Sequence, residues 1–371
     1  MKEKNFFYIF ASFIIGISTA IASFNYCMDH FGVFNGETKE ELETLNNRFV
    51  KMKYLLTNHN HDKYDSYLWG SSRVMKMDTF MTGQKTYNMG DSLEFPQDCL
   101  EQLKILLHQG VKIRTVYLGI DDYAYVTDRG SIMAELYRRD YSEDWEENWK
   151  YYAEVLFSVD LVKAEIKDWI HPRANGKVLL AKNGMLYIPY DVESLIEKNP
   201  DKHVKEDKFN EPTYLPFKGT EKFDQCLDSI KEIKMLCDAN GIQFIPFFNP
   251  QHMTTYLNDD MELMNRFKKE LVEISPFWDF SGVNYMTANN YFWYETSHPR
   301  AFICDKILDT VSGQNQMTWV PDFGVYVTAD NVDAFCEKAV RDREAYDPDH
   351  EQWIPTAEER AIMIKRVNYP W

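Results

Sequence analysis

The sequence lacks the cysteine spacings that mark metal-binding and thiol-redox sites. Its 6 cysteines form no CxxC pair, which argues against a zinc site or a thioredoxin-like centre. Cys226 and Cys237 share one apolar helical face, where packing as small hydrophobes accounts for them without a disulfide. His59 and His61 lie close together but have no third ligand in their loop, so we expect no metal site and no cofactor.

Basic residues are scarce relative to acidic ones. With 41 Lys and Arg against 58 Asp and Glu, the formal net charge is -17 at pH 7. Binding of nucleic acid depends on basic side chains that neutralise phosphates, so this balance argues against nucleic-acid partners. A general affinity for anionic lipid surfaces is disfavoured for the same reason. The net charge therefore argues against these two classes of partner and does not identify another.

The first 28 residues contain a long uncharged run, from 6 to 24. As a helix this run spans roughly 28 Å, close to the thickness of the hydrocarbon core of a bilayer. Lys2 and Lys4 precede it, so we expect a single membrane pass with a cytoplasmic N-terminus and an extracytoplasmic main domain. Small residues around Ala22 also fit a processing site, which leaves cleavage and secretion as the alternative.

Beyond this segment, β-rich runs alternate with amphipathic helices. The expected strands are 67–69, a strand ending near 88, 111–118 and 242–248. The expected helices are 38–56, 96–108, 152–169, 221–239 and 261–274. The alternation predicts an α/β fold with a doubly wound, mainly parallel sheet flanked by helices. We expect residues 29–371 to form one domain, with a variable insertion at about 123–218 that shapes a substrate cleft.

Polar residues and glycines follow the expected strands. They are Ser72, Gly90, Asp121 and Asn249. Open α/β sheets bind ligands beyond the carboxyl ends of their strands, so these residues are candidates for one site. Ser72 is also expected to open a helix, whose free N–H groups would favour an oxyanion. A helix cap explains a serine there equally well, and position does not choose between Ser71 and Ser72.

A histidine near the end of the chain is the candidate base for this serine. His298 follows Glu295 by three residues in an aromatic loop. A serine nucleophile needs an imidazole to take its proton, and the imidazole needs an acceptor to fix its tautomer. Taken alone, the three-residue spacing of Glu295 and His298 also fits an exposed ion pair on the surface.

Taken together, these segments resemble the ordered sequence blocks of a known superfamily. The blocks are Gly70-Ser71-Ser72, Asn88-Met89-Gly90, Gly119-Ile120-Asp121-Asp122 and Glu295-x-x-His298. In this order they resemble the SGNH/GDSL hydrolases. Residues 64–73 and 279–300 are especially similar to the membrane-anchored bacterial branch, which includes DltD and the alginate O-acetylation proteins. The resemblance covers about 44–307.

The resemblance implies an SGNH-type fold with Ser72 as nucleophile, His298 as general base and Glu295 as its orienting acid. The backbone N–H groups of Ser72 and Gly90 would bind the oxyanion. Family members usually have an asparagine as third donor and an aspartate before the histidine. Here Asp121 stands at the asparagine position, where a carboxylate would repel an oxyanion. The Asn88 side chain is then the candidate replacement.

Six further side chains are candidates, and all but Asn249 have two interpretations. Arg73 would bind an anionic substrate group or pair with an acid such as Asp65. His252 and Asn249 follow a strand end, and His252 would line the cleft or serve the fold. Trp69, like Trp293 and Tyr294, would stack on a sugar ring or pack at the sheet edge.

These observations favour ester chemistry on a cell-surface or exported glycan. The chain would be a serine esterase or an O-acyl (acetyl) transferase in polysaccharide or cell-wall modification. A membrane-bound O-acyltransferase partner is implied by the resemblance alone. The alternative is a catalytically inactive protein of the same fold that binds glycan or organises a modification complex, and Asp121 and Glu295 are the features that favour it.

Overall fold

A computed structural model gives the architecture of the chain. It describes residues 2–34, 45–127, 136–171, 179–187, 191–213, 221–318 and 323–364. These residues divide into two compact units. The N-terminal unit comprises 1–58 with 130–180, and the sheet unit comprises 59–129 with 181–371. Residues 29–58 and 130–180 thus group with the N-terminal helix, whereas the sequence predicted one domain from residue 29 onward.

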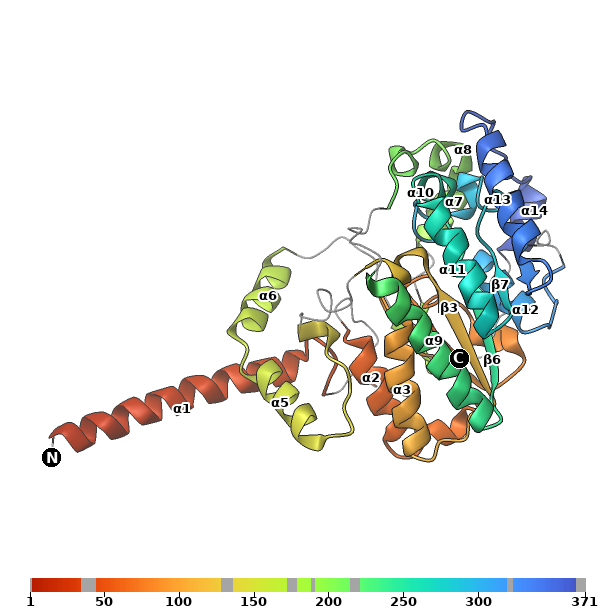
Figure 1. The fold of residues 1–371 in the computed structure, drawn as a ribbon. Coiled ribbons are helices and arrows are strands. Elements are labelled where there is room, and N and C mark those ends of the chain that lie inside the picture. The colour runs from red at the N-terminus through yellow and green to blue at the C-terminus, as the bar shows by residue number, and fades with distance from the viewer. Residues whose placement is uncertain are drawn as a thin grey trace. The chain divides into compact units, whose positions relative to one another are not determined.

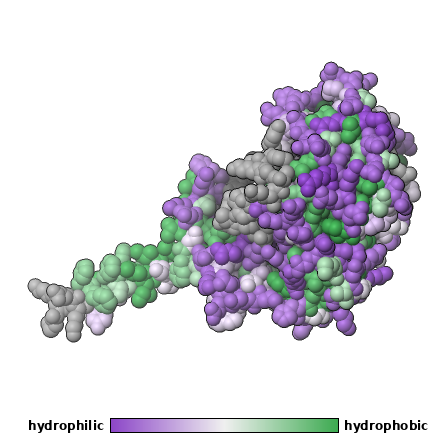
Figure 2. Space-filling model, viewed as in Figure 1, coloured by the Kyte–Doolittle hydropathy of each residue, from purple (hydrophilic) through white to green (hydrophobic). Residues whose placement is uncertain are grey.

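The N-terminal unit is helical. Its elements are α1 (Lys2–Met28), α2 (Asn47–Leu56), α5 (Trp145–Leu156), α6 (Val159–Ile170) and β4 (Leu179–Leu180). Residues 5–28 of α1 are long and apolar enough to cross a membrane, and Figure 2 shows this helix as predominantly hydrophobic. The core of the unit joins Phe31 and Phe49 to Tyr151, Val155 and Leu161 of the α5–α6 hairpin.

Two predicted helices of this unit differ from those observed. The helix expected over 38–56 begins at Asn47, where the Asn46 side chain caps it, and residues 35–44 lie outside the described part. The single helix expected over 152–169 is two helices. Ser158 separates them because its hydroxyl accepts the Leu161 N–H at 3.3 Å and caps α6.

The sheet unit is built on six strands. They are β1 (Ser66–Trp69), β2 (Thr86–Asn88), β3 (Thr115–Ile120), β6 (Gln243–Phe248), β7 (Phe277–Asp279) and β8 (Val325–Val327). Their order is β2-β1-β3-β6-β7-β8, with parallel pairing except between β7 and β8, which is antiparallel. The predicted α/β class is confirmed. The sheet is mixed because β8 is antiparallel to β7. The sequence did not predict β8, because this three-residue edge strand has two exposed residues and no recognisable strand pattern.

Helices cover both faces of this sheet. The α-helices and the remaining strand are α3 (Pro96–His108), β5 (Leu186–Tyr187), α7 (Asp191–Lys198), α8 (Pro200–His203), α9 (Glu221–Ala239), α10 (Met253–Tyr256), α11 (Met261–Ile274), α12 (Ala301–Val311), α13 (Val332–Ala345) and α14 (Ala357–Met363). Figure 1 shows α3, α9 and α11 side by side in front of β3 and β6. The predicted bounds of α3, α9 and α11 match the observed ones, since each has an apolar stripe and a clear start or stop signal.

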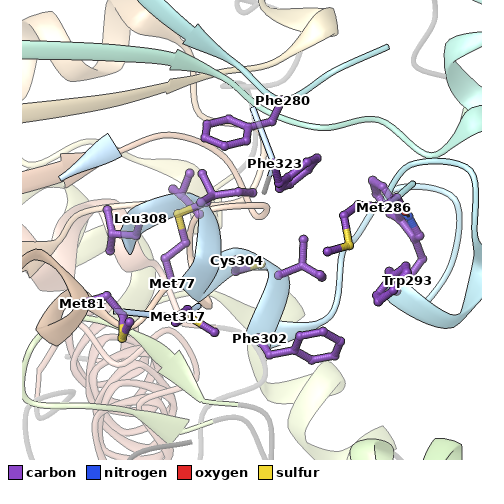
Figure 3. Packing of buried hydrophobic residues seen from close by; sticks show 14 of the residues in the cluster. Met77, Met81, Phe280, Met286, Trp293, Phe302, Cys304, Leu308, Met317 and Phe323 are labelled. Carbon is purple, nitrogen blue, oxygen red and sulfur yellow. The ribbon is translucent and has the colours of Figure 1, made fainter. Parts of the chain in front are cut away.

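Alternate residues of β1 point to opposite faces of the sheet and pack against the helices there. Trp69 donates its indole N–H to Gln102 of α3 at 2.9 Å, whereas Leu68 joins the cluster around α12. In that cluster Met77 and Met81 reach α12 from the segment after β1, as Figure 3 shows. Trp293, from the loop before α12, belongs to the same cluster. One core therefore fixes both the segment that follows β1 and the loop that precedes α12.

Candidate active site

The chain leaves β1 and turns sharply at Ser71 and Ser72. The helix predicted to open at Ser72 is absent, because residues 72–76 form hydrogen-bonded turns. The Val74 N–H donates to the Ser71 carbonyl at 3.0 Å. The Val74 carbonyl in turn accepts a hydrogen bond from the Asn88 side-chain amide at 2.8 Å. This carbonyl is therefore not available for the backbone hydrogen bond that a helix would require. Ser72 is therefore presented by a turn, and no helix N-terminus stands behind it.

Glycines at three strand ends leave room for this turn. A Cβ at Gly90 would lie 2.6 Å from Val74 Cγ2, and one at Gly119 would lie 2.6 Å from Val74 Cγ1. Neither approach is possible for a larger residue unless Val74 moves. Gly70 has a φ of 144°, a conformation that favours glycine. The glycines therefore allow the Ser72 turn to sit directly on the ends of the strands.

Ser72 meets His298 beyond the carboxyl end of β1. The Ser72 Oγ lies 2.8 Å from His298 Nε2. On the other side of the ring, His298 Nδ1 is hydrogen-bonded to the Glu295 carboxylate. The second oxygen of Glu295 accepts the Ser297 N–H at 2.6 Å, which fixes the carboxylate within the loop. The structure thus brings Ser72, His298 and Glu295 into one hydrogen-bonded chain.

The loop that carries His298 is closed on itself and bound to α7. The Tyr294 N–H donates to the His298 carbonyl at 2.9 Å. Arg300 is fully buried, and its guanidinium contacts Glu193 at 2.5 Å and Glu197 at 2.8 Å. Breaking such a buried pair leaves uncompensated charge, so the contact is costly to open. This network holds the histidine in place.

The electrostatic surroundings leave His298 neutral. Burial lowers the pKa of His298 below its ordinary value, although the hydrogen bond to Glu295 opposes the shift; Lys76 and Arg73 lower it further. For Glu295, burial acts to raise the pKa, but the hydrogen bond and charge of His298 outweigh it and the pKa falls. Near neutral pH the imidazole can accept a proton and the carboxylate is ionised, as a base and its orienting acid require.

Arg73 is buried beside the candidate nucleophile and pairs with two carboxylates. Its Nη1 lies 2.7 Å from Asp121 and 2.5 Å from Asp122. Its Nε donates to the Ser297 carbonyl at 3.0 Å. Burial acts to lower the pKa of Arg73, but the two carboxylates raise it, so the guanidinium stays charged. The acid that pairs with Arg73 is therefore not Asp65, the partner considered from sequence.

This pairing changes the role of Asp121. Its Oδ1 also accepts the Asn249 side-chain amide at 3.1 Å, and both residues are buried. A lone carboxylate would repel an oxyanion, but here Arg73 compensates its charge. Asp121 therefore holds Arg73 and Asn249 next to the site, and the predicted repulsion is weakened.

The predicted oxyanion donors differ in their availability. Within the described part of the chain, the N–H of Ser72 donates to no acceptor. The Gly90 N–H donates to Asn88 Oδ1 at 2.9 Å. The Asn88 amide donates to the carbonyls of Val74 at 2.8 Å and Met77 at 3.2 Å. Asn88 as the replacement third donor does not fit this geometry, because its amide hydrogens are directed into the turn.

His252 has a role in the fold. Its Nε2 lies 2.8 Å from Asn290 Oδ1, and its Nδ1 accepts the Thr254 N–H at 3.2 Å, which caps α10. Its ring stacks on Phe209 with centroids 5.3 Å apart. Burial lowers the pKa of His252 to about 4. Both ring nitrogens of His252 are hydrogen-bonded within the fold, so the structure favours the predicted structural role over lining the cleft.

The two tryptophans pack in the interior. Trp69 is fully buried, and the Trp293 indole N–H donates to the Met286 carbonyl at 2.9 Å. A sugar ring has no access to either indole face in this arrangement. His59 and His61 have ring centroids 5.7 Å apart, and no group of three metal-ligating side chains within the described ranges includes them. All six cysteines are free thiols.

Sequence reasoning missed Lys76. Its Nζ lies 4.5 Å from the centroid of the Tyr294 ring, beside the loop of the candidate base. Its charge lowers the pKa of both His298 and Glu295, after the effects of burial and their mutual hydrogen bond. No motif marks a lysine four residues after a candidate nucleophile, so its only sequence signal was its nearness to Ser72 along the chain.

A cavity of about 250 Å³ adjoins this site through Asp122. Its polar lining comes from Asp122, Thr213, Thr255, Asn258, Asp259 and Asp260. Thr255 Oγ1 donates to the Thr296 carbonyl at 2.9 Å, which connects the wall of the cavity to the loop of His298. Burial, followed by the charge of Asp122, raises the pKa of Asp259 to about 7. The cavity therefore offers hydroxyl and carboxyl groups close to the candidate nucleophile.

No protein-family model matches this chain, and no curated protein matches it.

Proposed function

We propose that this protein is a serine hydrolase or acyl transferase of the SGNH type, in which Ser72 forms an acyl-enzyme. The observation that carries the proposal is the 2.8 Å contact between Ser72 Oγ and His298 Nε2, with Glu295 on the other ring nitrogen. A hydroxyl beside a neutral imidazole that a carboxylate orients is the arrangement that activates serine. The order of the sequence blocks and the largely parallel sheet support the same assignment.

The proposed reaction has two steps. Ser72 Oγ attacks the carbonyl carbon of an acyl donor while His298 Nε2 takes the hydroxyl proton. The oxyanion faces the Ser72 N–H, and its collapse breaks the bond to the leaving group, which receives the proton from His298. Water or a sugar hydroxyl then gives a proton to His298 and attacks the Ser72 ester. Collapse of this second intermediate breaks the bond between the acyl carbon and Ser72 Oγ, which takes the proton back from His298. Hydrolysis and transfer share these groups, so water exclusion and acceptor binding decide between them.

We infer that α1 is a retained anchor with the main domain outside the cytoplasm. Asn25 near the end of α1 is buried, and Ile21, Ala22 and Phe24 are partly buried, so the end of α1 belongs to the folded N-terminal unit. Cleavage near Ala22 would cut inside this packed segment, which favours anchoring over secretion. Lys2 and Lys4 on the N-terminal side of the span support the proposed orientation.

A cell-surface or exported glycan is the substrate class that fits this location. The cavity beside Asp122 presents carboxyl and hydroxyl groups, which hydrogen-bond readily to sugar hydroxyls. An acetyl or other acyl group would be transferred to or removed from such a glycan. A membrane-bound O-acyltransferase that supplies the acyl group belongs to this proposal through the SGNH resemblance.

The proposal is tested by measuring ester hydrolysis by the full-length protein in detergent micelles with p-nitrophenyl acetate. Ser72→Ala and His298→Ala should each abolish the enzyme-dependent rate. Ser71→Ala is the matched control, because Ser71 is buried and its hydroxyl accepts the Arg73 N–H at 3.1 Å, away from His298. Ser71→Ala should keep activity within a few-fold of wild type. If Ser72→Ala is as active as wild type, Ser72 is not the nucleophile.

A non-catalytic glycan-binding protein is the second candidate. It is favoured by the Gly90 N–H and the Asn88 amide, which are both bound within the protein and leave the oxyanion with fewer donors than the family pattern has. Wild-type protein that binds a glycan yet shows no ester hydrolysis and no acyl transfer would support this candidate.

A further inference from the structure

The α5–α6 hairpin of the N-terminal unit exposes an apolar face that its own core does not use. Its inner side chains, among them Tyr151, Val155 and Leu161, pack in the core of the unit. On the outside, Trp149 of α5 is 61% exposed, Ile166 of α6 is 46% exposed and Trp169 is 83% exposed. Few large apolar side chains of a folded domain are this exposed without a partner.

These exposed residues form a stripe on each helix. At 100° per residue, the exposed apolar side chains of α6 fall within about a third of the helix circumference. They are Val159, Ile166, Trp169 and Ile170, with the partly buried Val162 among them. On α5, Trp145 and Trp149 are one turn apart. Lys167 and Asp160 lie on the other exposed side of α6. Each helix therefore has one apolar face packed in the core of the unit, a second apolar strip on its exposed outer side, and polar side chains elsewhere.

The hairpin is fixed to the end of α1. The buried Asn25 side chain donates to the carbonyls of Val155 at 3.1 Å, Leu156 at 2.9 Å and Ser158 at 2.9 Å. These carbonyls belong to the turn between α5 and α6, and one turn beyond Asn25 the His30 ring is hydrogen-bonded to Glu165 of α6. The turn of the hairpin thus sits at the level where the uncharged run of α1 ends.

The direction of the two helices suits a membrane surface. In Figure 1, α5 runs across the direction of α1, and α6 runs obliquely to it. If α1 crosses a bilayer, a helix that crosses it at its end lies near the plane of the interface, and a helix that leaves it obliquely from the same level begins at that interface. Tryptophan is the residue most typical of that region, since its ring is apolar and its N–H is polar. Amphipathic helices in this position bury one apolar strip at the boundary of headgroups and acyl chains.

We propose that the α5–α6 hairpin is a membrane-interface element, whose outer apolar strips lie in the lipid beside the point where α1 leaves the bilayer. The proposal rests on the proposed anchoring by α1. Between residues 145 and 170 there are six acidic and three basic side chains, so charge attraction to anionic lipid does not drive the contact. The hairpin therefore enters zwitterionic lipid through its apolar side chains, and it fixes the orientation of the N-terminal unit on the membrane.

The experiment is site-directed spin labelling of the full-length protein in phosphatidylcholine vesicles. Cys27→Ser removes the exposed thiol, and the other five cysteines are buried. Single labels are placed at Ile166→Cys on the apolar strip, at Lys167→Cys on the polar side and at Phe13→Cys in the middle of α1. Trp149→Cys repeats the test on α5. Collision rates of each label with oxygen, which enters lipid, and with a water-soluble nickel chelate are compared.

The labels at Ile166→Cys and Trp149→Cys should have oxygen-to-nickel collision ratios several-fold above the label at Lys167→Cys and closer to that at Phe13→Cys. If Ile166→Cys is as accessible to nickel as Lys167→Cys while Phe13→Cys lies in lipid, the anchor stands and the interface proposal is overturned. Shielding of Ile166→Cys from both reagents would show a protein partner instead of lipid and would also overturn it. Nickel access at Phe13→Cys would refute the anchor, and the interface proposal falls with it.

Discussion

The guanidinium of Arg73 lies 2.7 Å from Asp121 Oδ1, and neither side chain is more than 4% exposed. This pair puts a positive charge immediately after Ser72 and supplies its counter-ion. Under the proposed SGNH assignment, it gives a physical reason for an aspartate at the position where that sequence pattern has an asparagine. The buried guanidinium needs a carboxylate more than the site needs a neutral amide at that position.

Replacing Asp121 should therefore destabilise the fold. Asp121→Asn leaves Arg73 with Asp122 as its one acidic partner and should lower the free energy of unfolding by about 1–3 kcal/mol. Asp122→Asn is the matched control and should cost less, because the Asp122 side chain is 13% exposed against 1% for Asp121. Urea unfolding of the full-length protein in detergent measures both. An Asp121→Asn protein as stable as wild type would contradict the counter-ion role.

The pH dependence of catalysis should report the lowered pKa of His298. The neutral imidazole is the active form, so kcat/KM should rise with pH through a pKa below 6.5 and then level off. Lys76→Met removes a cation that lowers this pKa, so the acidic limb should move to higher pH. Lys85→Met, at an exposed position, should leave the limb where it is. A pH profile unchanged by Lys76→Met would show that Lys76 does not act on the base.

The Glu295 carboxylate should matter through the tautomer of His298. Glu295→Gln removes the negative charge that accepts the hydrogen bond from His298 Nδ1–H, and it should lower kcat/KM by on the order of 10⁴-fold. Glu295→Asp keeps the charge with one methylene less and should retain far more activity. Steady-state kinetics on an ester substrate compare the two. Equal losses in both variants would mean that the histidine requires the length of the Glu295 side chain as much as its charge.

The buried His252 should make stability depend on pH. Its pKa is about 4 in the fold against an ordinary 6.5, so the unfolded chain binds the extra proton between these values. Its contribution is fully present above pH 6.5 and is lost as the pH falls towards 4, by on the order of 3 kcal/mol. His252→Gln should flatten this part of the stability profile in urea unfolding. An unchanged slope would mean that His252 titrates normally in the native state.

Three helices of the sheet unit, α3, α9 and α11, and four of its strands, β1, β2, β3 and β6, could be predicted because their signals are local. Pro96 opens α3 and Gly241 follows the end of α9, and both bounds match the sequence pattern. The turn after Ser72 could not be predicted. Its form depends on the Asn88 side chain, which reaches it from β2 and binds its carbonyls. Contacts between distant segments leave no periodic pattern in the sequence.

The candidate site shows the same difference between local signals, which the sequence reveals, and contacts between distant segments, which it does not. Ser72, Glu295 and His298 were found from residue type, spacing and block order, and the structure places them together. The partners of Arg73 were not found, since an arginine has many acids within reach and only the fold selects Asp121 and Asp122. The available sequence signals therefore identified the candidate catalytic groups, and missed the charges that surround them.

Covalent labelling with a fluorophosphonate tests the central claim most directly. The probe forms a stable phosphonyl ester with a serine that a neighbouring base activates. Mass spectrometry of the labelled full-length protein should locate one adduct on Ser72, and Ser72→Ala and His298→Ala should lose it while Ser71→Ala keeps it. Equal labelling of wild type and Ser72→Ala, or no labelling of folded wild-type protein, would contradict the assignment of Ser72 as an activated nucleophile.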